Sequence, residues 1–76
     1  MKELLEFIAK SMVSNPDAVS VKETLNDTAV VLELHVAEDD MGKVIGKQGR
    51  IAKAIRAVMK SAASKEHKKV TVDIKD

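Results

Sequence analysis

The stretch GKVIGKQGRIAKAIR, residues 42–56, decides how this chain of 76 residues folds. It contains all three glycines and five of the 13 basic residues. The glycines precede a run whose apolar spacing predicts a helix from about Arg50 to Ala63, and a shorter helix, Met41–Ile45, is expected before them. The stretch therefore predicts two helices joined by a basic, glycine-rich turn.

Two nucleotide-binding motifs are excluded at this turn. A P-loop requires G-x-x-x-x-G-K-[ST], because the hydroxyl holds magnesium. Here three residues separate Gly42 from Gly46, and Gln48 stands where the hydroxyl is needed. The dinucleotide motif G-x-G-x-x-G requires a glycine in place of Val44. What remains is a G-x-x-G motif at residues 46–49.

A G-x-x-G turn of this kind has the features of a phosphate-binding site. Glycines lack a Cβ, so a polyanionic backbone can approach the main chain closely. The N-terminus of the following helix presents unpaired N–H groups and a partial positive charge. Lys47 and Arg50 add full charges at the same point. The alternative is a tight corner that needs flexible residues only, and the motif alone does not decide between the two.

The helix after the turn carries three arcs when its residues are placed at intervals of 100°. An outward basic ridge contains Arg50, Lys53, Arg56 and Lys60. A stripe that is expected to face the core contains Ile51, Ala54, Ile55, Val58 and Ala62. A further apolar arc contains Ala52, Met59 and Ala63. This arc either seats the first helix within the domain or forms a self-complementary contact in a dimer.

The rest of the chain completes the order α-β-β-α-α-β. Residues 3–13 have helical spacing and end at Ser14–Asp17, where Asn15 precedes a proline. Residues 19–25 and 29–37 alternate as two strands of a hairpin, and residues 70–75 alternate as a final strand. We expect a single α+β domain, residues 1–76, with a three-stranded sheet packed on helices. One aspartate of the acidic run 38–40 is expected to cap the short helix.

Charge and composition limit the function classes. Residues 1–42 carry a net charge of −6 and residues 43–76 carry +7, which points weakly to a polyanionic partner. The chain has no cysteine and no apolar run long enough to cross a membrane, so we expect a cytoplasmic protein. His35 and His67 have no ligand set around them, and we expect neither an enzyme nor a metal or cofactor.

The residues VIGKQG, Val44–Gly49, resemble the signature loop of KH domains, in which G-x-x-G joins two helices and clamps about four nucleotides of a single strand. The order of elements resembles the type II KH fold over essentially the whole chain. More narrowly, DMGKVIGKQGRIAKAIR in a chain of this length is similar to the KhpA family of small bacterial KH proteins.

This resemblance implies a set of RNA-binding residues. The loop residues are Gly46, Lys47, Gln48 and Gly49, with Lys43, Arg50 and Lys53 around them and Val44 and Ile45 lining the groove. Ile55 is a further candidate for the lining. Ala52 departs from the isoleucine or leucine that many KH domains have at this place. Because the chain lacks Tyr and Trp, we expect weak sequence selectivity and mainly backbone contacts.

The resemblance also implies partners and a cellular role. The implied role is that of a cytoplasmic protein that binds single-stranded RNA and acts as an RNA chaperone or post-transcriptional regulator. The implied partners are a second copy of the chain and a larger KH-containing protein of the KhpB (Jag or EloR) type. The family is linked to cell elongation, cell shape and peptidoglycan homeostasis. No membrane or small-molecule substrate is implied. The alternative is a protein-interaction module that uses the Ala52, Met59 and Ala63 arc, with G-x-x-G as a corner only.

Overall fold

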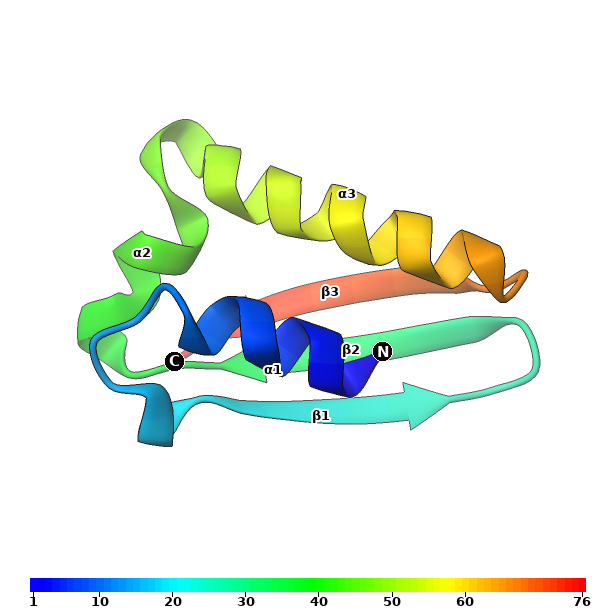
Figure 1. Cartoon of the computed structure of the whole chain (residues 1–76), viewed down its shortest axis with the longest axis horizontal. Coiled ribbons are helices and arrows are strands. Elements are labelled where there is room, and N and C mark those ends of the chain that lie inside the picture. The colour runs from blue at the N-terminus through cyan, green and yellow to red at the C-terminus, as the bar shows by residue number, and fades with distance from the viewer.

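Three strands form one mixed sheet in the computed structural model, which describes residues 1–76 (Figure 1). The strands are β1 (Ser20–Leu25), β2 (Ala29–His35) and β3 (Lys69–Lys75), in the order β1-β2-β3. β1 pairs antiparallel with β2, and β3 pairs parallel with β2. A parallel neighbour requires a crossover, which the two helices between β2 and β3 supply. The predicted α+β fold is confirmed.

The β1–β2 hairpin is closed by Asn26. The Asn26 Oδ1 atom accepts hydrogen bonds from the N–H groups of Thr28 (3.0 Å) and Ala29 (2.7 Å). Along β2 every second residue is fully buried, namely Val30, Leu32 and Leu34. This alternation fixes the register of the hairpin, because a slip by one residue would turn these side chains to solvent.

The helices are α1 (Lys2–Lys10), α2 (Met41–Ile45) and α3 (Arg50–Lys65). α1 ends at Lys10, earlier than the predicted residue 13. At the next residue the Ser11 hydroxyl donates to the Ile8 carbonyl at 2.7 Å. Met12 and Val13 still pack against the core from the segment that follows. α1 and α3 cover the same face of the sheet, and the α2–α3 turn lies at one end of the molecule (Figure 1). No helix has the length and apolar character that crossing a membrane requires.

The face that α3 presents to the sheet differs from the prediction. The buried residues of α3 are Ala52, Ile55, Met59 and Ala63. Of the stripe predicted to face the core, only Ile55 is buried, whereas Val58 is 47% exposed. The helix is apolar over about half of its circumference, so hydrophobic pattern alone left its rotation open. The residues buried instead, Ala52, Met59 and Ala63, belong to the further apolar arc.

Candidate nucleic-acid interface

The turn between α2 and α3 is held in one shape by its own backbone. The Gly46 N–H donates to the Gly42 carbonyl at 2.9 Å, and the Gly49 N–H donates to the Gly46 carbonyl at 3.1 Å. Gln48 (φ 58°, ψ 24°) and Gly49 (φ 74°, ψ 16°) are both left-handed, and Arg50 returns to the right-handed region. The Arg50 N–H in turn donates to the Lys47 carbonyl, so consecutive backbone hydrogen bonds hold the turn.

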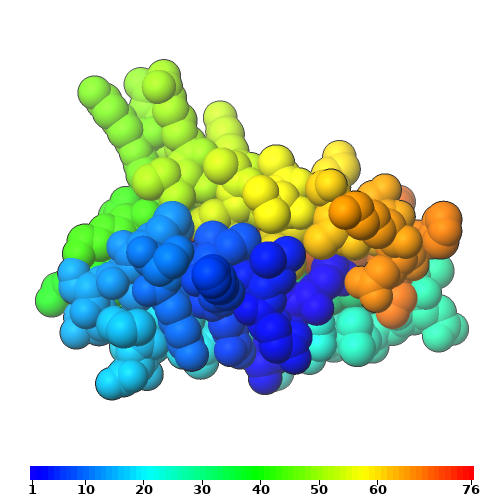
Figure 2. Space-filling model, viewed as in Figure 1, coloured from blue at the N-terminus to red at the C-terminus, as the bar shows by residue number.

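The N-terminus of α3 begins at this turn, and no side chain caps it. The partial positive charge of the helix end therefore lies at the turn. Lys47 and Gln48 are exposed, and neither side chain takes part in an ion pair or hydrogen bond within the chain. The segment around the turn projects from the body of the molecule (Figure 2). The geometry is thus that of an accessible anion site.

The three glycines of the stretch have different local environments. A Cβ on Gly46 would lie 2.6 Å from the Ile51 Cγ1 atom, and Gly46 also has a positive φ of 76°. Gly49 requires its left-handed conformation, but a Cβ there would meet nothing within 4 Å. Gly42 lies in α2 and would also meet nothing within 4 Å. Gly46 is therefore required by packing, whereas Gly42 and Gly49 leave open space beside the backbone.

The basic ridge of α3 continues from the turn as predicted. Arg50, Lys53, Arg56 and Lys60 are all exposed. Arg56 is fixed in place, because its Nε atom donates to the Val72 carbonyl of β3 at 3.2 Å. A hollow of about 340 Å³ follows the seam between α3 and β3, and it is lined by Arg56, Lys60 and the residues of β3 from Val70 to Asp73. The ridge and the seam together make a basic track that begins at the G-x-x-G turn.

Val44 and Ile55 do not line this track. Val44 is fully buried and Ile55 is 3% exposed, so both belong to the core that is shared with the sheet. Ile45 is half-buried and packs against the same core. Of the three apolar lining residues expected from the sequence, only Ile45 has surface to offer a ligand.

Lys43 is held within the chain by a buried aspartate. The Asp40 carboxylate is fully buried and accepts hydrogen bonds from the N–H groups of Ser14 and Asn15, each at 3.0 Å. The Lys43 Nζ atom lies 3.5 Å from Asp40 Oδ1 and also donates to the Ser14 hydroxyl. The structure therefore directs the Lys43 charge to Asp40 rather than to the turn.

The Asp40 hydrogen bonds have an electrostatic consequence. The Ser14 N–H is the main reason that the pKa of Asp40 lies below that of a free aspartate; burial opposes this lowering, while Asn15 and Lys43 add to it. The prediction that an aspartate of the run 38–40 caps α2 is wrong. Asp40 is the residue before α2, but its side chain accepts no hydrogen bond from the amides of that helix. Its carboxylate instead ties the loop after α1 to the start of α2.

A match to a protein-family model identifies the family of this fold. The model of the KhpA/KhpB KH domain matches residues 2–74, which run from the start of α1 to all but the last residue of β3. The chain belongs to the KhpA/KhpB KH-domain family. Residues 46–49 carry the G-x-x-G motif, between α2 and α3.

Curated relatives extend the match to whole proteins. A protein named RNA-binding protein KhpA from Clostridium perfringens is 64% identical over 74 residues, which are 97% of this chain and 99% of the relative. A protein of the same name from Halalkalibacterium halodurans is 51% identical over the full length of both chains. Another from Chlamydia trachomatis is 45% identical over 74 residues, which are 97% of this chain and 95% of the relative. No solved structure gives a significant match.

Two surfaces of this KH domain were missed by the sequence analysis. The first is a basic hollow at the far end of α3, for which the signal was the charged run at residues 66–69. The second is an apolar groove between α1 and α3 with a volume of about 360 Å³. Its lining residues are Ile8, Met12, Arg50, Ile51, Ala54, Ile55 and Val58. The groove arises because α3 turns its predicted core stripe toward solvent.

Proposed function

We propose that this chain binds single-stranded RNA and clamps its backbone at the G-x-x-G turn. The observation that carries the proposal is the exposed G-x-x-G turn at the uncapped N-terminus of α3, which continues into a ridge of exposed basic side chains. Membership of the KH family and relatives named RNA-binding proteins support it. Gly46, Lys47, Gln48 and Gly49 form the clamp, and Arg50 and Lys53 extend it.

The contacts that this surface offers are mainly with phosphate. The turn presents a helix N-terminus and a lysine, and the only aromatic residue, Phe7, belongs to α1 rather than to the turn. Phosphate contacts position a strand without reading its sequence. We therefore expect weak base preference, in keeping with an RNA chaperone or post-transcriptional regulator that acts on many RNAs in the cytoplasm.

The test is the binding of a short labelled single-stranded RNA at two salt concentrations. The variant Lys47→Asp/Gln48→Asp should lose salt-sensitive binding, since each lost phosphate contact lowers the log–log salt slope by about 0.7. Lys2→Asp/Asn26→Asp is the matched control, because it makes the same change in net charge at sites remote from the turn. Circular dichroism checks that both variants fold. Equal binding by wild type and the turn variant would reduce the turn to a structural corner.

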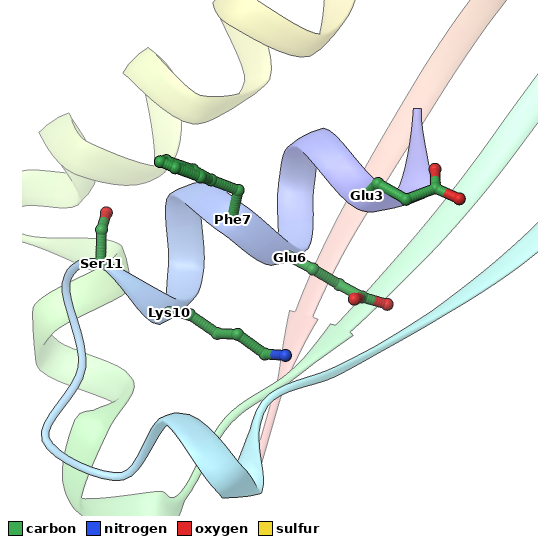
Figure 3. Close-up of a pocket in the computed structure, with 5 residues that line it drawn as sticks. All are labelled: Glu3, Glu6, Phe7, Lys10 and Ser11. Carbon is green, nitrogen blue, oxygen red and sulfur yellow. The ribbon is translucent and has the colours of Figure 1, made fainter.

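We further propose that the chain forms a homodimer through the apolar groove between α1 and α3. The arc of Ala52, Met59 and Ala63 does not provide this contact, because these residues are 4%, 0% and 0% exposed within one chain. Exposed apolar side chains lie beside the groove instead: Leu4 is 40%, Phe7 65% and Val58 47% exposed. Figure 3 shows Phe7 pointing from α1 toward the side on which α3 lies, with Glu6 and Lys10 projecting from the other side of α1.

Charge favours a second copy of this chain as the occupant of the groove. Glu3 lies with the exposed Phe7 in a neighbouring hollow on α1, and Arg50 lines the groove on α3. A two-fold axis through the patch would place the acidic edge of one copy near the basic edge of the other. Val58→Glu should convert the dimer to a monomer in sedimentation velocity, whereas Ala57→Glu, which lies outside the groove, should leave it intact. A wild-type monomer at high concentration would refute the proposal.

The same face suits a partner that carries a related domain. The family model groups the KH domains of KhpA and KhpB, so a KhpB-type (Jag or EloR) protein would present a surface of similar shape. We propose such a partner, with a role in cell elongation, cell shape and peptidoglycan homeostasis. Copurification of a KhpB-type protein that Val58→Glu abolishes, together with altered cell length in the mutant strain, is the expected result.

A further inference from the structure

α2 is too short to hold its own position. It has five residues, Met41–Ile45, and an isolated helix of this length has too few hydrogen bonds to offset the cost of starting it. The G-x-x-G turn begins at the next residue, Gly46, so the direction in which α2 points also sets where the turn lies. The contacts that hold α2 against the rest of the domain therefore bear on RNA binding as well as on stability.

Asp40 supplies the polar contacts at the start of α2. Its carboxylate is fully buried, and its two oxygens accept hydrogen bonds from the N–H groups of Ser14 and Asn15, at 3.0 Å each. These amides belong to the segment that follows α1, which runs beside α2 (Figure 1). From α2 itself, the Lys43 Nζ atom lies 3.5 Å from Asp40 Oδ1 and donates to the Ser14 hydroxyl. The start of α2 is thus fastened to the segment after α1.

Apolar packing holds α2 in a different way. Val44 is fully buried, whereas Met41 and Ile45 are only partly buried against the core. Apolar contacts have no preferred direction, so they fix how deeply α2 lies better than they fix where it points. The hydrogen bonds to Asp40 do fix the direction, because such bonds weaken steeply when their angle changes.

We propose that Asp40 is a positioning residue for RNA binding, whose carboxylate holds α2, and with it the G-x-x-G turn, in the orientation that accepts the strand. The inference rests on the proposed function and adds a residue that does not contact RNA, because Asp40 is fully buried. Stability alone does not require a carboxylate at this place, since well-packed apolar residues often replace a buried ion pair without loss. A carboxylate that accepts two backbone N–H groups provides direction, which an apolar side chain does not.

The test compares Asp40→Asn/Lys43→Gln with Lys43→Gln in titrations of a short uridine oligomer. Lys43 is removed from both proteins, because loss of Asp40 alone would release its charge to RNA. Asparagine keeps the size of the side chain, but its NH₂ group faces one of the two N–H donors that the carboxylate accepts. If the fraction of molecules with a correctly placed turn falls to about a fifth, the apparent affinity falls about fivefold. The salt slope should stay unchanged, because no phosphate contact is removed.

Asp39→Asn/Lys43→Gln is the matched control. Asp39 is exposed and forms no ion pair within the chain, so its substitution makes the same change in charge one residue away. This control should bind RNA no more weakly than Lys43→Gln. Urea denaturation of the same samples gives the folded fraction of each variant, and affinities are compared for that fraction, so that lost stability is not counted as lost binding.

Hydrogen exchange of the wild-type protein gives a second measurement that needs no variant. The Gly46 N–H, which donates to the Gly42 carbonyl at the end of α2, should be exposed by the same opening as the Ser14 and Asn15 amides that donate to Asp40. The three amides should then share one free energy of opening and one dependence on urea. A Gly46 amide that opens more easily than the other two would show that the turn moves while the Asp40 bonds are intact, and would overturn the proposal.

Three results of the titrations also overturn the positioning role alone. They are equal affinities of Asp40→Asn/Lys43→Gln and Lys43→Gln, an equal loss in the Asp39 control, and a loss that is accompanied by a smaller salt slope. In each case Lys47→Asp/Gln48→Asp still loses salt-sensitive binding, so the proposed function stands. If wild type binds no RNA, or if Lys47→Asp/Gln48→Asp binds it as well as wild type does, the proposed function fails and this inference fails with it.

Discussion

Alanine substitution of the three glycines should separate stability from RNA binding. Gly46→Ala combines two costs. The φ of 76° with ψ of 175° is essentially reserved for glycine, at about 1–3 kcal/mol. The clash at 2.6 Å with Ile51 adds about 1–3 kcal/mol of overpacking. A domain of this length has a total stability of roughly 4–11 kcal/mol, so this variant should be largely or partly unfolded.

The other two glycines should behave differently from Gly46 and from each other. Gly49→Ala should cost about 1–2 kcal/mol, because φ is 74° but no atom lies within 4 Å of the new Cβ. Gly42→Ala should raise stability by about 0.5–1 kcal/mol, because alanine is the better helix former and its Cβ also meets open space. The fold gives no reason for a glycine at position 42, and close approach of RNA to this turn of α2 supplies one.

Urea denaturation and RNA titration of the same samples measure both effects. We expect Gly42→Ala to be more stable than wild type and to bind RNA roughly fivefold more weakly, which corresponds to about 1 kcal/mol of steric interference. Loss of stability in Gly42→Ala would refute the structural reasoning. Unchanged RNA affinity in Gly42→Ala would show that the strand does not approach α2, and would restrict the clamp to residues 46–50.

Three further predictions concern Asp40, Lys43 and the rotation of α3. The pKa of Asp40 is lowered in the folded state, so the Asp40 carboxylate stabilises the fold above the pKa of a free aspartate. This stabilisation is lost as pH falls toward the pKa of Asp40 in the folded state. Below about pH 4, urea denaturation should therefore show a steeper loss of stability for wild type than for Asp40→Asn. Lys43→Gln should leave the salt slope of RNA binding unchanged, because Lys43 is paired with Asp40, whereas Lys53→Gln should reduce the slope by about 0.7 in the same titration. An equal reduction in both variants would show that Lys43 leaves Asp40 to contact RNA. Met59→Ala should cost about 2–5 kcal/mol in thermal or urea unfolding and Val58→Ala much less, and the reverse order would restore the predicted core stripe.

Local pattern predicted the strands and the turn well, for a physical reason. β2 alternates fully buried and half-buried residues because one face is covered by helices, and this period is written in Val30, Leu32 and Leu34. The Asn26 turn is equally local, since the bonds that close it span two and three residues. Features that depend on neighbours in sequence were therefore accessible before the structure.

Features that depend on distant contacts were not accessible. Asp40 appeared to be a helix cap because its true partners, the amides of Ser14 and Asn15, lie 26 and 25 residues away in the chain. The rotation of α3 depended on how closely Ala52 and Ala63 let the helix approach its neighbours, and periodicity does not encode that closeness. The ion pair of Lys43 with Asp40 could not be foreseen either, because the burial of Asp40 depends on these distant amides.

The charge asymmetry of the sequence acquires a meaning only through the topology. The change from −6 to +7 falls after residue 42, within α2. Everything after it forms the G-x-x-G turn, α3 and β3, and these are the elements on both sides of the seam. Because β3 pairs parallel with β2, the chain must cross over the sheet before it returns along the sheet edge. The excess of positive charge is thereby placed around one continuous track, where a polyanionic strand would gain the most from it.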